Sequence, residues 1–136
     1  RAIDLAKERG AKRAMELPVS APFHCSLMQP AADEMQAALS DTKISAPAVP
    51  VIANVCAVPV SDPEEIRQLL VEQITARVRW RESMIWLADN DAGNLVELGN
   101  GRVLATMARR IDPRLAATAL STPDDIRTYL GETQGD

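Results

Sequence analysis

The residue best suited to chemistry is His24, the only histidine in this 136-residue chain. It lies in residues 20–26 (SAPFHCS), a predicted loop at a strand-to-helix junction. An imidazole titrates near neutral pH, as a general base must. A lone histidine is more often structural, yet loops at the ends of parallel strands are where α/β proteins hold ligands. We therefore expect His24 to be a catalytic base.

A general base needs a nucleophile, and no residue of the chain fills that role clearly. Cys25 is adjacent to His24, but neighbouring side chains usually point apart, and the partner normally comes from elsewhere in the chain. Ser20, Ser26 and Ser83 fit by residue type alone. None stands in a G-x-S-x-G turn, which presents a serine hydroxyl to its base. If His24 is catalytic, its serine is on a segment outside these 136 residues.

Three further positions and one glycine pair could contribute to a site. Asn54 interrupts an apolar run, and a buried amide must find partners, so it either braces a loop or faces a site. Phe23, the only phenylalanine, is by type more often a core residue than a pocket wall. Gln73 lies near the end of a predicted helix, where a polar residue is unremarkable. The GNG at 99–101 lacks the third glycine of a dinucleotide fingerprint, which favours a tight turn.

Helical and strand patterns alternate along the chain, which predicts an α/β fold with a mainly parallel sheet. Gly10 is expected to end the first helix, Ser26 to cap the second, and Asp62 with Pro63 to begin the third. The predicted helices cover residues 2–9, 27–39, 63–73, 79–89, 102–110 and 124–130, and the predicted strands cover 14–19, 49–55 (a buried strand), 95–98 and 115–120.

Composition argues against several classes of function. With 19 acidic and 15 basic residues the net charge is −4, so nucleic acid is not expected as a partner. Arg77, Arg79 and Arg81 cluster; they either face an anionic partner or form a solvated rim. No apolar run approaches the roughly 20 residues that cross a bilayer, and the first five residues, RAIDL, do not have the architecture of a signal peptide. Cys25 and Cys56 are isolated, which predicts no metal site and reduced thiols in a cytoplasmic protein.

Four segments, in order, resemble one family. They are LPVSAPFHCSLM at 17–28, PVIANV at 50–55, LVEQI with VRWRES at 70–83, and ELGNGRVL at 97–104. Each is modest alone, but together they cover nearly the whole chain at family-like spacing. The chain resembles the C-terminal portion of malonyl-CoA:acyl carrier protein transacylases of bacterial fatty-acid synthesis. The acyltransferase domains of polyketide synthases are the nearest alternative.

The resemblance implies an α/β fold: the C-terminal part of an α/β-hydrolase-like acyltransferase core, with an inserted ferredoxin-like subdomain. Residues 1–19 would be the last helix and strand of that small subdomain, and residues 20–136 the C-terminal part of the large one. We also expect the chain to be a piece of a longer protein, because it opens within a predicted helix without an initiator Met.

The resemblance also implies a ping-pong reaction. A serine takes malonyl from malonyl-CoA and passes it to the phosphopantetheine thiol of acyl carrier protein, with malonyl-CoA as substrate and no cofactor. His24 would be the base, held at Nδ1 by the backbone carbonyl of Gln73 in place of an acid. Phe23 and Asn54 would contact the substrate. In the related synthase domains an aromatic residue before the histidine goes with malonyl, which implies that Phe23 favours it.

The family's serine, oxyanion glutamine and malonyl-binding arginine lie upstream, and none of them is in this chain. We therefore expect the chain alone to be inactive and its partner to include the upstream half of the same enzyme. Two rival hypotheses remain: a non-catalytic fragment that binds carrier protein, and an unrelated structural α/β domain.

Overall fold

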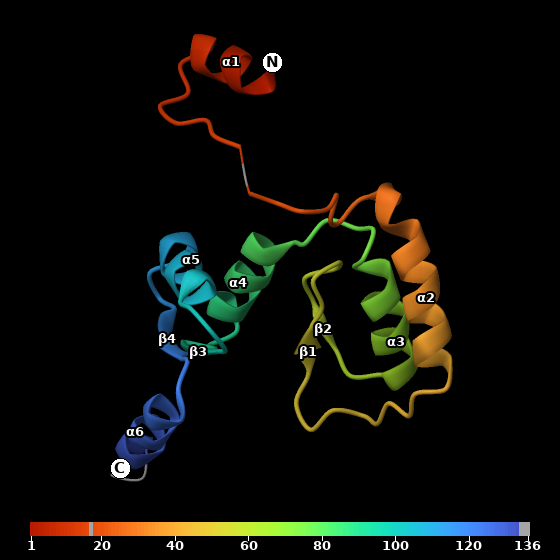
Figure 1. Cartoon of the computed structure of the whole chain (residues 1–136). Coiled ribbons are helices and arrows are strands. Elements are labelled where there is room, and N and C mark those ends of the chain that lie inside the picture. Colours follow the sequence, from red (N-terminus) through yellow and green to blue (C-terminus); the bar gives the residue numbers. More distant parts are fainter. Residues whose placement is uncertain (17, 134–136) are drawn as a thin grey trace.

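The computed structural model describes residues 1–16 and 18–133. Helices and strands alternate along most of the chain, as an α/β fold requires (Figure 1). In chain order the elements are α1 (Ala2–Glu8), the short 3-10 helix η1 (Ser26–Met28), α2 (Gln29–Ser40), β1 (Val51–Ile52), β2 (Pro59–Val60), α3 (Pro63–Glu72), α4 (Trp80–Asp89), β3 (Asn94–Leu98), α5 (Val103–Ile111), β4 (Ala116–Leu120) and α6 (Pro123–Thr133).

The elements form two groups joined by residues 73–79. Figure 1 shows α2 and α3 beside the β1–β2 pair in one group, and α4, α5, β3 and β4 in the other. Helix α1 lies apart at the N-terminal end and has no buried residue. The segment between the two groups carries Gln73, so the connection itself is part of the candidate site.

The prediction of a mainly parallel sheet is met only in part, because the described residues hold two separate strand pairs and one of them is antiparallel. β3 and β4 pair in parallel over five residues, with α5 as the crossover. β1 and β2 pair antiparallel, Val51 opposite Val60. The six residues between β1 and β2 explain the difference, because so short a connection permits a hairpin but not a parallel crossover.

Two strand predictions need correction. Residues 14–16 and 18–19 form no strand, and Leu17 lies outside the described residues. Extended backbone becomes a strand only when a neighbour satisfies its polar groups, and no described segment pairs with it. The predicted buried strand 49–55 is reduced to β1, and its Val51 is 43% exposed.

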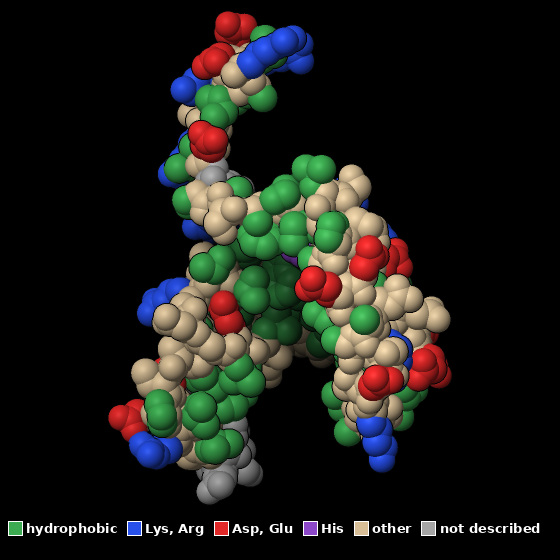
Figure 2. Space-filling model, turned by 45° about the vertical axis from the view of Figure 1, so that its right-hand side comes forward, with side chains coloured by type: hydrophobic (Ala, Val, Ile, Leu, Met, Phe, Trp, Pro, Cys, Tyr) green, Lys and Arg blue, Asp and Glu red, His purple; other side chains and the backbone are tan. Residues whose placement is uncertain are grey.

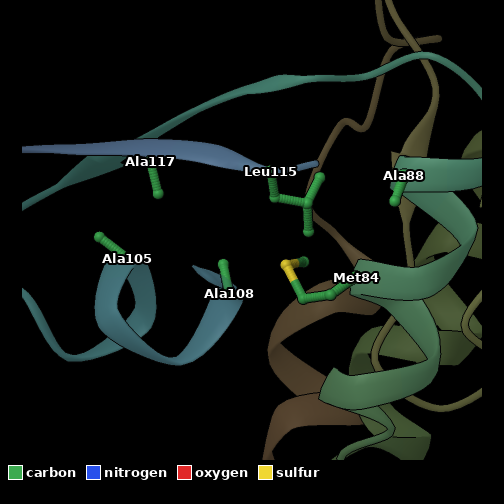
Figure 3. Packing of buried hydrophobic residues seen from close by; sticks show 6 residues of the cluster. All are labelled: Met84, Ala88, Ala105, Ala108, Leu115 and Ala117. Atoms are coloured by element: carbon green, nitrogen blue, oxygen red, sulfur yellow. The ribbon is translucent and has the colours of Figure 1, made fainter. Parts of the chain in front are cut away.

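The main core lies between α4, α5 and the β3–β4 pair. Leu115, just before β4, is 1% exposed and packs with Met84 of α4 and Ala108 of α5. Figure 3 shows these side chains converging together with Ala88, Ala105 and Ala117. Burial of a leucine side chain stabilises a fold by about 1.5–3 kcal/mol. The small alanines let α5 approach the strands closely, which fixes this group as a unit.

The ends of the helices follow the predicted signals with one exception. Asp62 caps α3, accepting hydrogen bonds from the backbone N–H groups of Glu64 at 3.0 Å and Glu65 at 2.8 Å, and Pro63 is the first helical residue. Gly10 ends α1 with a φ of +88°. The predicted cap by Ser26 is wrong: Ser26 begins η1, and α2 has no side-chain cap. The 3-10 turn places two residues, Leu27 and Met28, between Ser26 and the first residue of α2.

Candidate active site

His24 lies in a tight loop with an unusual backbone. Its φ is +58°, in the left-handed region that costs a residue with a side chain about 1–2 kcal/mol. Two local hydrogen bonds accompany this turn, from the Phe23 N–H to the Ala21 carbonyl at 2.9 Å and from the Cys25 thiol to the Pro22 carbonyl at 3.1 Å. A conformation of this cost persists where surrounding contacts hold it, which is common at functional sites.

The imidazole of His24 is anchored by the end of α3. Its Nδ1 lies 2.8 Å from the backbone carbonyl oxygen of Gln73, the contact that the family resemblance implies. Gln73 is the C-cap residue of α3, where carbonyl oxygens have lost their intrahelical partners and remain free to accept. A carbonyl can only accept, so Nδ1 carries the proton in this contact. In the neutral ring, Nε2 is then left with the lone pair that a general base needs.

The carbonyl that binds His24 lies at the C-terminal end of a helix. The C-terminal end of a helix carries a partial negative charge, equivalent to roughly half an electron. Helix α3 is ten residues long and ends one residue before the carbonyl that contacts His24. The carbonyl that holds the His24 ring therefore belongs to the negative end of the helix dipole. The group that orients the imidazole is thus a backbone carbonyl and not an acidic side chain.

Asn54 holds the side chain of Gln73. It lies in the turn between β1 and β2 rather than in a strand, and its Nδ2 donates to the Gln73 Oε1 at 2.9 Å. Its own carbonyl accepts from the Arg79 N–H at 2.8 Å. Of the two alternatives drawn from the sequence, the structure shows a brace between segments; contact with substrate stays a prediction.

Phe23 is exposed, not part of the core. Its side chain is 55% exposed, which contradicts the expectation from residue type and leaves the ring available to a ligand. Phe23 lies near the site because it is adjacent to His24 in the sequence. His24, Gln73 and Asn54, in contrast, are joined by hydrogen bonds. The structure therefore assembles three of the four predicted residues and places the fourth next to them.

The three clustered arginines, Arg77, Arg79 and Arg81, lie in different environments. Arg79 is half-buried and donates from Nη1 to the Cys56 carbonyl at 3.1 Å, so it ties the 73–79 connection to the β1–β2 turn. Its Nε lies 3.5 Å from Glu82. The pKa of Glu82 is lowered, first by a hydrogen bond from its own backbone N–H and also by Arg79. Arg77 and Arg81 remain exposed. This structural role of Arg79 could not be predicted from the sequence, because nothing in the spacing distinguishes Arg79 from its neighbours.

An apolar hollow lies beside the site. A cavity of about 280 Å³ runs between Ile52 and Asn54 on one side and Trp80, Met84 and Leu104 on the other. Figure 2 shows hydrophobic side chains over the inner walls of the space between the two groups. The Nε1 of Trp80 is buried without a hydrogen-bond partner among the described residues. A larger groove of about 750 Å³ lies along α5 and β4 and is lined by none of the four site residues.

No group of three or more histidine, cysteine, aspartate or glutamate side chains within residues 1–16 and 18–133 is arranged to hold a metal ion. No helix of the described part is long and apolar enough to cross a membrane.

Comparison with known proteins identifies related sequences and folds. No family model matches the chain. It is 43% identical over 124 residues to the malonyl CoA-acyl carrier protein transacylase of Salmonella typhimurium, covering 91% of this chain and 40% of that protein. The crystal structure of an acyl-carrier-protein S-malonyltransferase from Bartonella henselae matches with 49% identity and a TM-score of 0.88, covering 98% of this chain and 42% of that one.

A third match includes a bound carrier protein. It is a malonyl-transacylase in complex with its type II PKS acyl-carrier protein, with 39% identity and a TM-score of 0.86 over 96% of this chain and 42% of that one. The chain spans about two fifths of the length of the relatives it matches. It is therefore homologous, over nearly its whole length, to a segment of malonyl CoA-acyl carrier protein transacylases, a family of acyltransferases.

Proposed function

We propose that this chain supplies the general base of a malonyl-CoA:acyl carrier protein transacylase, with His24 as the base and Gln73 as its anchor. The observation that carries the proposal is the 2.8 Å contact between the His24 Nδ1 and the Gln73 carbonyl. It leaves Nε2 free for a nucleophile and requires no acidic residue. The similarity to malonyl transacylases supplies the reaction class.

In the first half-reaction, a serine hydroxyl attacks the thioester carbonyl of malonyl-CoA. The Nε2 of His24 takes the hydroxyl proton as the new C–O bond forms. The C–S bond then breaks, and the imidazolium returns the proton to the departing thiolate of coenzyme A. Malonyl is left as an ester on the serine.

In the second half-reaction, the phosphopantetheine thiol of acyl carrier protein replaces coenzyme A. His24 takes the thiol proton, the thiolate attacks the malonyl ester, and the C–O bond to the serine breaks. The proton passes to the serine oxygen, which restores the enzyme. His24 is thus base and then acid in each half-reaction, so its ring must stay oriented in both charge states. The hydrogen bond from Nδ1 to the Gln73 carbonyl serves this need, because Nδ1 keeps its proton in both charge states.

The remaining parts of the site belong to the same proposal. These 136 residues hold no G-x-S-x-G turn, so the proposal assigns the serine and the oxyanion donors to a segment upstream of this one, as the resemblance implies. Residues 1–19 would then end a ferredoxin-like subdomain, in keeping with the separation of α1 from the other elements, and residues 20–136 would continue an α/β-hydrolase-like one. Carrier protein and malonyl-CoA are the expected partners, in a cytoplasmic enzyme without a cofactor.

The test measures malonyl transfer from coenzyme A to acyl carrier protein. The chain is co-expressed with a homologous transacylase segment that bears the serine turn. We expect turnover, and His24→Ala should lower kcat by about 10²–10⁴-fold, the usual contribution of general acid–base catalysis. A matched control is Cys25→Ala in the same loop, which should retain turnover. Turnover that survives His24→Ala would reject His24 as the base, and carrier-protein binding without turnover would favour the non-catalytic fragment.

A further inference from the structure

The contacts around Gln73 form a continuous path from the β1–β2 turn to His24. Asn54 donates to the Gln73 side chain at 2.9 Å, and the Gln73 carbonyl accepts from His24 at 2.8 Å. The Arg79 N–H holds the Asn54 carbonyl at 2.8 Å. Asn54 is therefore fixed at its backbone, and Gln73 is bound through both its side chain and its carbonyl.

We infer that Asn54 is a positioning residue for His24: by holding the Gln73 amide, it directs the Gln73 carbonyl at Nδ1 and selects the Nδ1–H tautomer of the ring. This inference rests on the proposed function only for its consequence in catalysis. The geometry behind it is independent of the reaction. Asn54 acts through Gln73, and no contact between Asn54 and the imidazole is needed.

The position of Gln73 explains why such a brace is needed. Gln73 follows the last residue of α3, where helices fray and where the backbone of the next residues turns away. Its N–H is still bound to the Leu69 carbonyl at 3.0 Å, but its own carbonyl points out of the helix to His24. A carbonyl at a helix end has more freedom than one inside the ladder. The half-buried pair formed by Asn54 and Gln73 removes that freedom.

The apolar surroundings of the pair strengthen it. A small cavity of about 110 Å³ is lined by Asn54 and Gln73 together with Ile52, Ile66 and Leu69. An amide among apolar side chains loses more by giving up its partner than an amide in water. The Gln73 Oε1 therefore favours the Asn54 donor over water. This hydrogen bond fixes the position of Gln73, whose carbonyl binds His24.

The experiment reads the tautomer of His24 directly. Because the chain has one histidine, ¹⁵N labelling gives a single imidazole in a long-range ¹H–¹⁵N correlation spectrum. The spectrum is recorded at about pH 9, where an imidazole is neutral. Since only this chain is labelled, the spectrum can also be recorded with an unlabelled complementary segment that keeps the chain in solution. We expect the native chain to show the Nδ1–H form, with Nε2 unprotonated.

Asn54→Ala should convert this single form into the mixture of tautomers of an unconstrained imidazole. Gln73→Ala, which keeps the backbone carbonyl, should cause the same change, and adding Asn54→Ala to it should change nothing further. Asn54→Asp should retain the native form, because the Gln73 amide can rotate and donate its NH₂ to the carboxylate. The matched control is Asn90→Ala, which removes a 2.8 Å bond to the Trp86 carbonyl elsewhere in the chain; it should leave the tautomer unchanged.

A native tautomer in both Asn54→Ala and Gln73→Ala would overturn the inference. If Asn54→Ala fails to fold, as judged by loss of amide dispersion, the folded Gln73→Ala chain decides the question alone. The result is separate from the proposed function. If the variants change the tautomer but the native protein lacks transacylase turnover, the proposed function is rejected and the positioning role is kept. If the native protein turns over and the variants keep the native tautomer, the positioning role is rejected and the proposed function is kept.

Discussion

The carboxylate of Glu97 caps helix α5 from the end of strand β3. Its Oε2 accepts a hydrogen bond from the Ala105 N–H at 2.8 Å, and its Oε1 accepts from the Leu104 N–H at 3.2 Å. Between β3 and α5 the chain passes through Gly99 and Gly101. Their φ values of +132° and +114° belong to the left-handed region that favours glycine. The tight turn predicted from the GNG sequence is thus a strand-to-helix connection closed by Glu97.

Removing this cap should destabilise the core group. Glu97→Ala leaves two N–H groups of the first turn without their acceptor and removes a negative charge from the positive end of α5. The expected loss is about 0.5–2 kcal/mol, as for other N-terminal caps. Glu97→Gln should lose less, since one amide oxygen can still accept. The measurement is urea unfolding, with Glu34→Ala on the exposed surface of α2 as the control. Equal losses in the free energy of unfolding for Glu97→Ala and Glu34→Ala would show that Glu97 does not act as a cap.

Asp112 should make stability depend on pH in the acidic range. The Arg114 side chain donates to Asp112, with Nη2 at 2.7 Å from Oδ2, and these hydrogen bonds lower the pKa of Asp112 to about 2. A lowered folded-state pKa means that the stabilisation is complete above the unfolded-state value and is lost as the pH falls through the folded-state value. The ordinary aspartate pKa is about 3.9. The window therefore lies between about pH 4 and pH 2.

The corresponding experiment compares Asp112→Asn with the native chain. The variant should melt at a lower temperature at neutral pH, and the difference in Tm should close as the pH falls through that window. Asp41→Asn, at the exposed end of α2, provides a control for the charge change. A Tm difference that persists unchanged at about pH 2 would show that the Asp112 carboxylate acts through something other than its charge.

Local signals in the sequence predicted most of the helices and much of the site. Asp62 with Pro63 placed the start of α3, and the apolar spacing near Met84 placed α4. The resemblance predicted the contact between His24 and Gln73, which the structure contains. Composition alone could not have found it, since a backbone carbonyl can belong to any residue. Only the end of α3 makes the carbonyl of Gln73 available.

Strands were predicted less well, because a strand depends on a partner that is distant in sequence. The β-branched residues near Val51 indicate a strand, but its length is set by what pairs with it, and here only Pro59 and Val60 do. Asn54 shows the same limit. Its sequence position could not reveal whether it faces a ligand or a neighbouring helix end, and the answer required the spatial closeness of Gln73.

Phe23 should favour malonyl over branched acyl groups in an active enzyme. Phe23 directly precedes His24 in the same loop, and its ring is exposed. The ring can therefore narrow the space beside the acyl α-carbon. Phe23→Ser should raise the methylmalonyl to malonyl ratio of kcat/KM by about 10–200-fold, since a misfit methyl costs about 1–3 kcal/mol. Leu27→Ser, at a side chain that is 73% exposed, is the matched control and should leave the ratio near its native value. An unchanged ratio for Phe23→Ser would remove this ring from the pocket.

The 136-residue chain by itself should show no transacylase turnover and poor solubility. Acyl transfer through an enzyme ester needs a nucleophile, a base and oxyanion donors in one site, and of these the chain offers only the proposed base, His24. Among the described residues β3 pairs only with β4, which leaves its other edge open. Leu98 on that strand is 74% exposed, and Val103 is 66% exposed. Open strand edges and apolar surface favour aggregation.

Co-expression with the segment that bears the serine turn should therefore improve solubility and turnover together. Light scattering measures the first, and transfer of malonyl from coenzyme A to carrier protein measures the second. Leu98→Asp should weaken both, because it places a charge on the apolar surface that the segment must cover. Turnover by the purified chain alone would contradict the prediction. If Cys25→Ala then abolished that turnover, the nucleophile would be the Cys25 thiol, which the structure places within 3.1 Å of the Pro22 carbonyl.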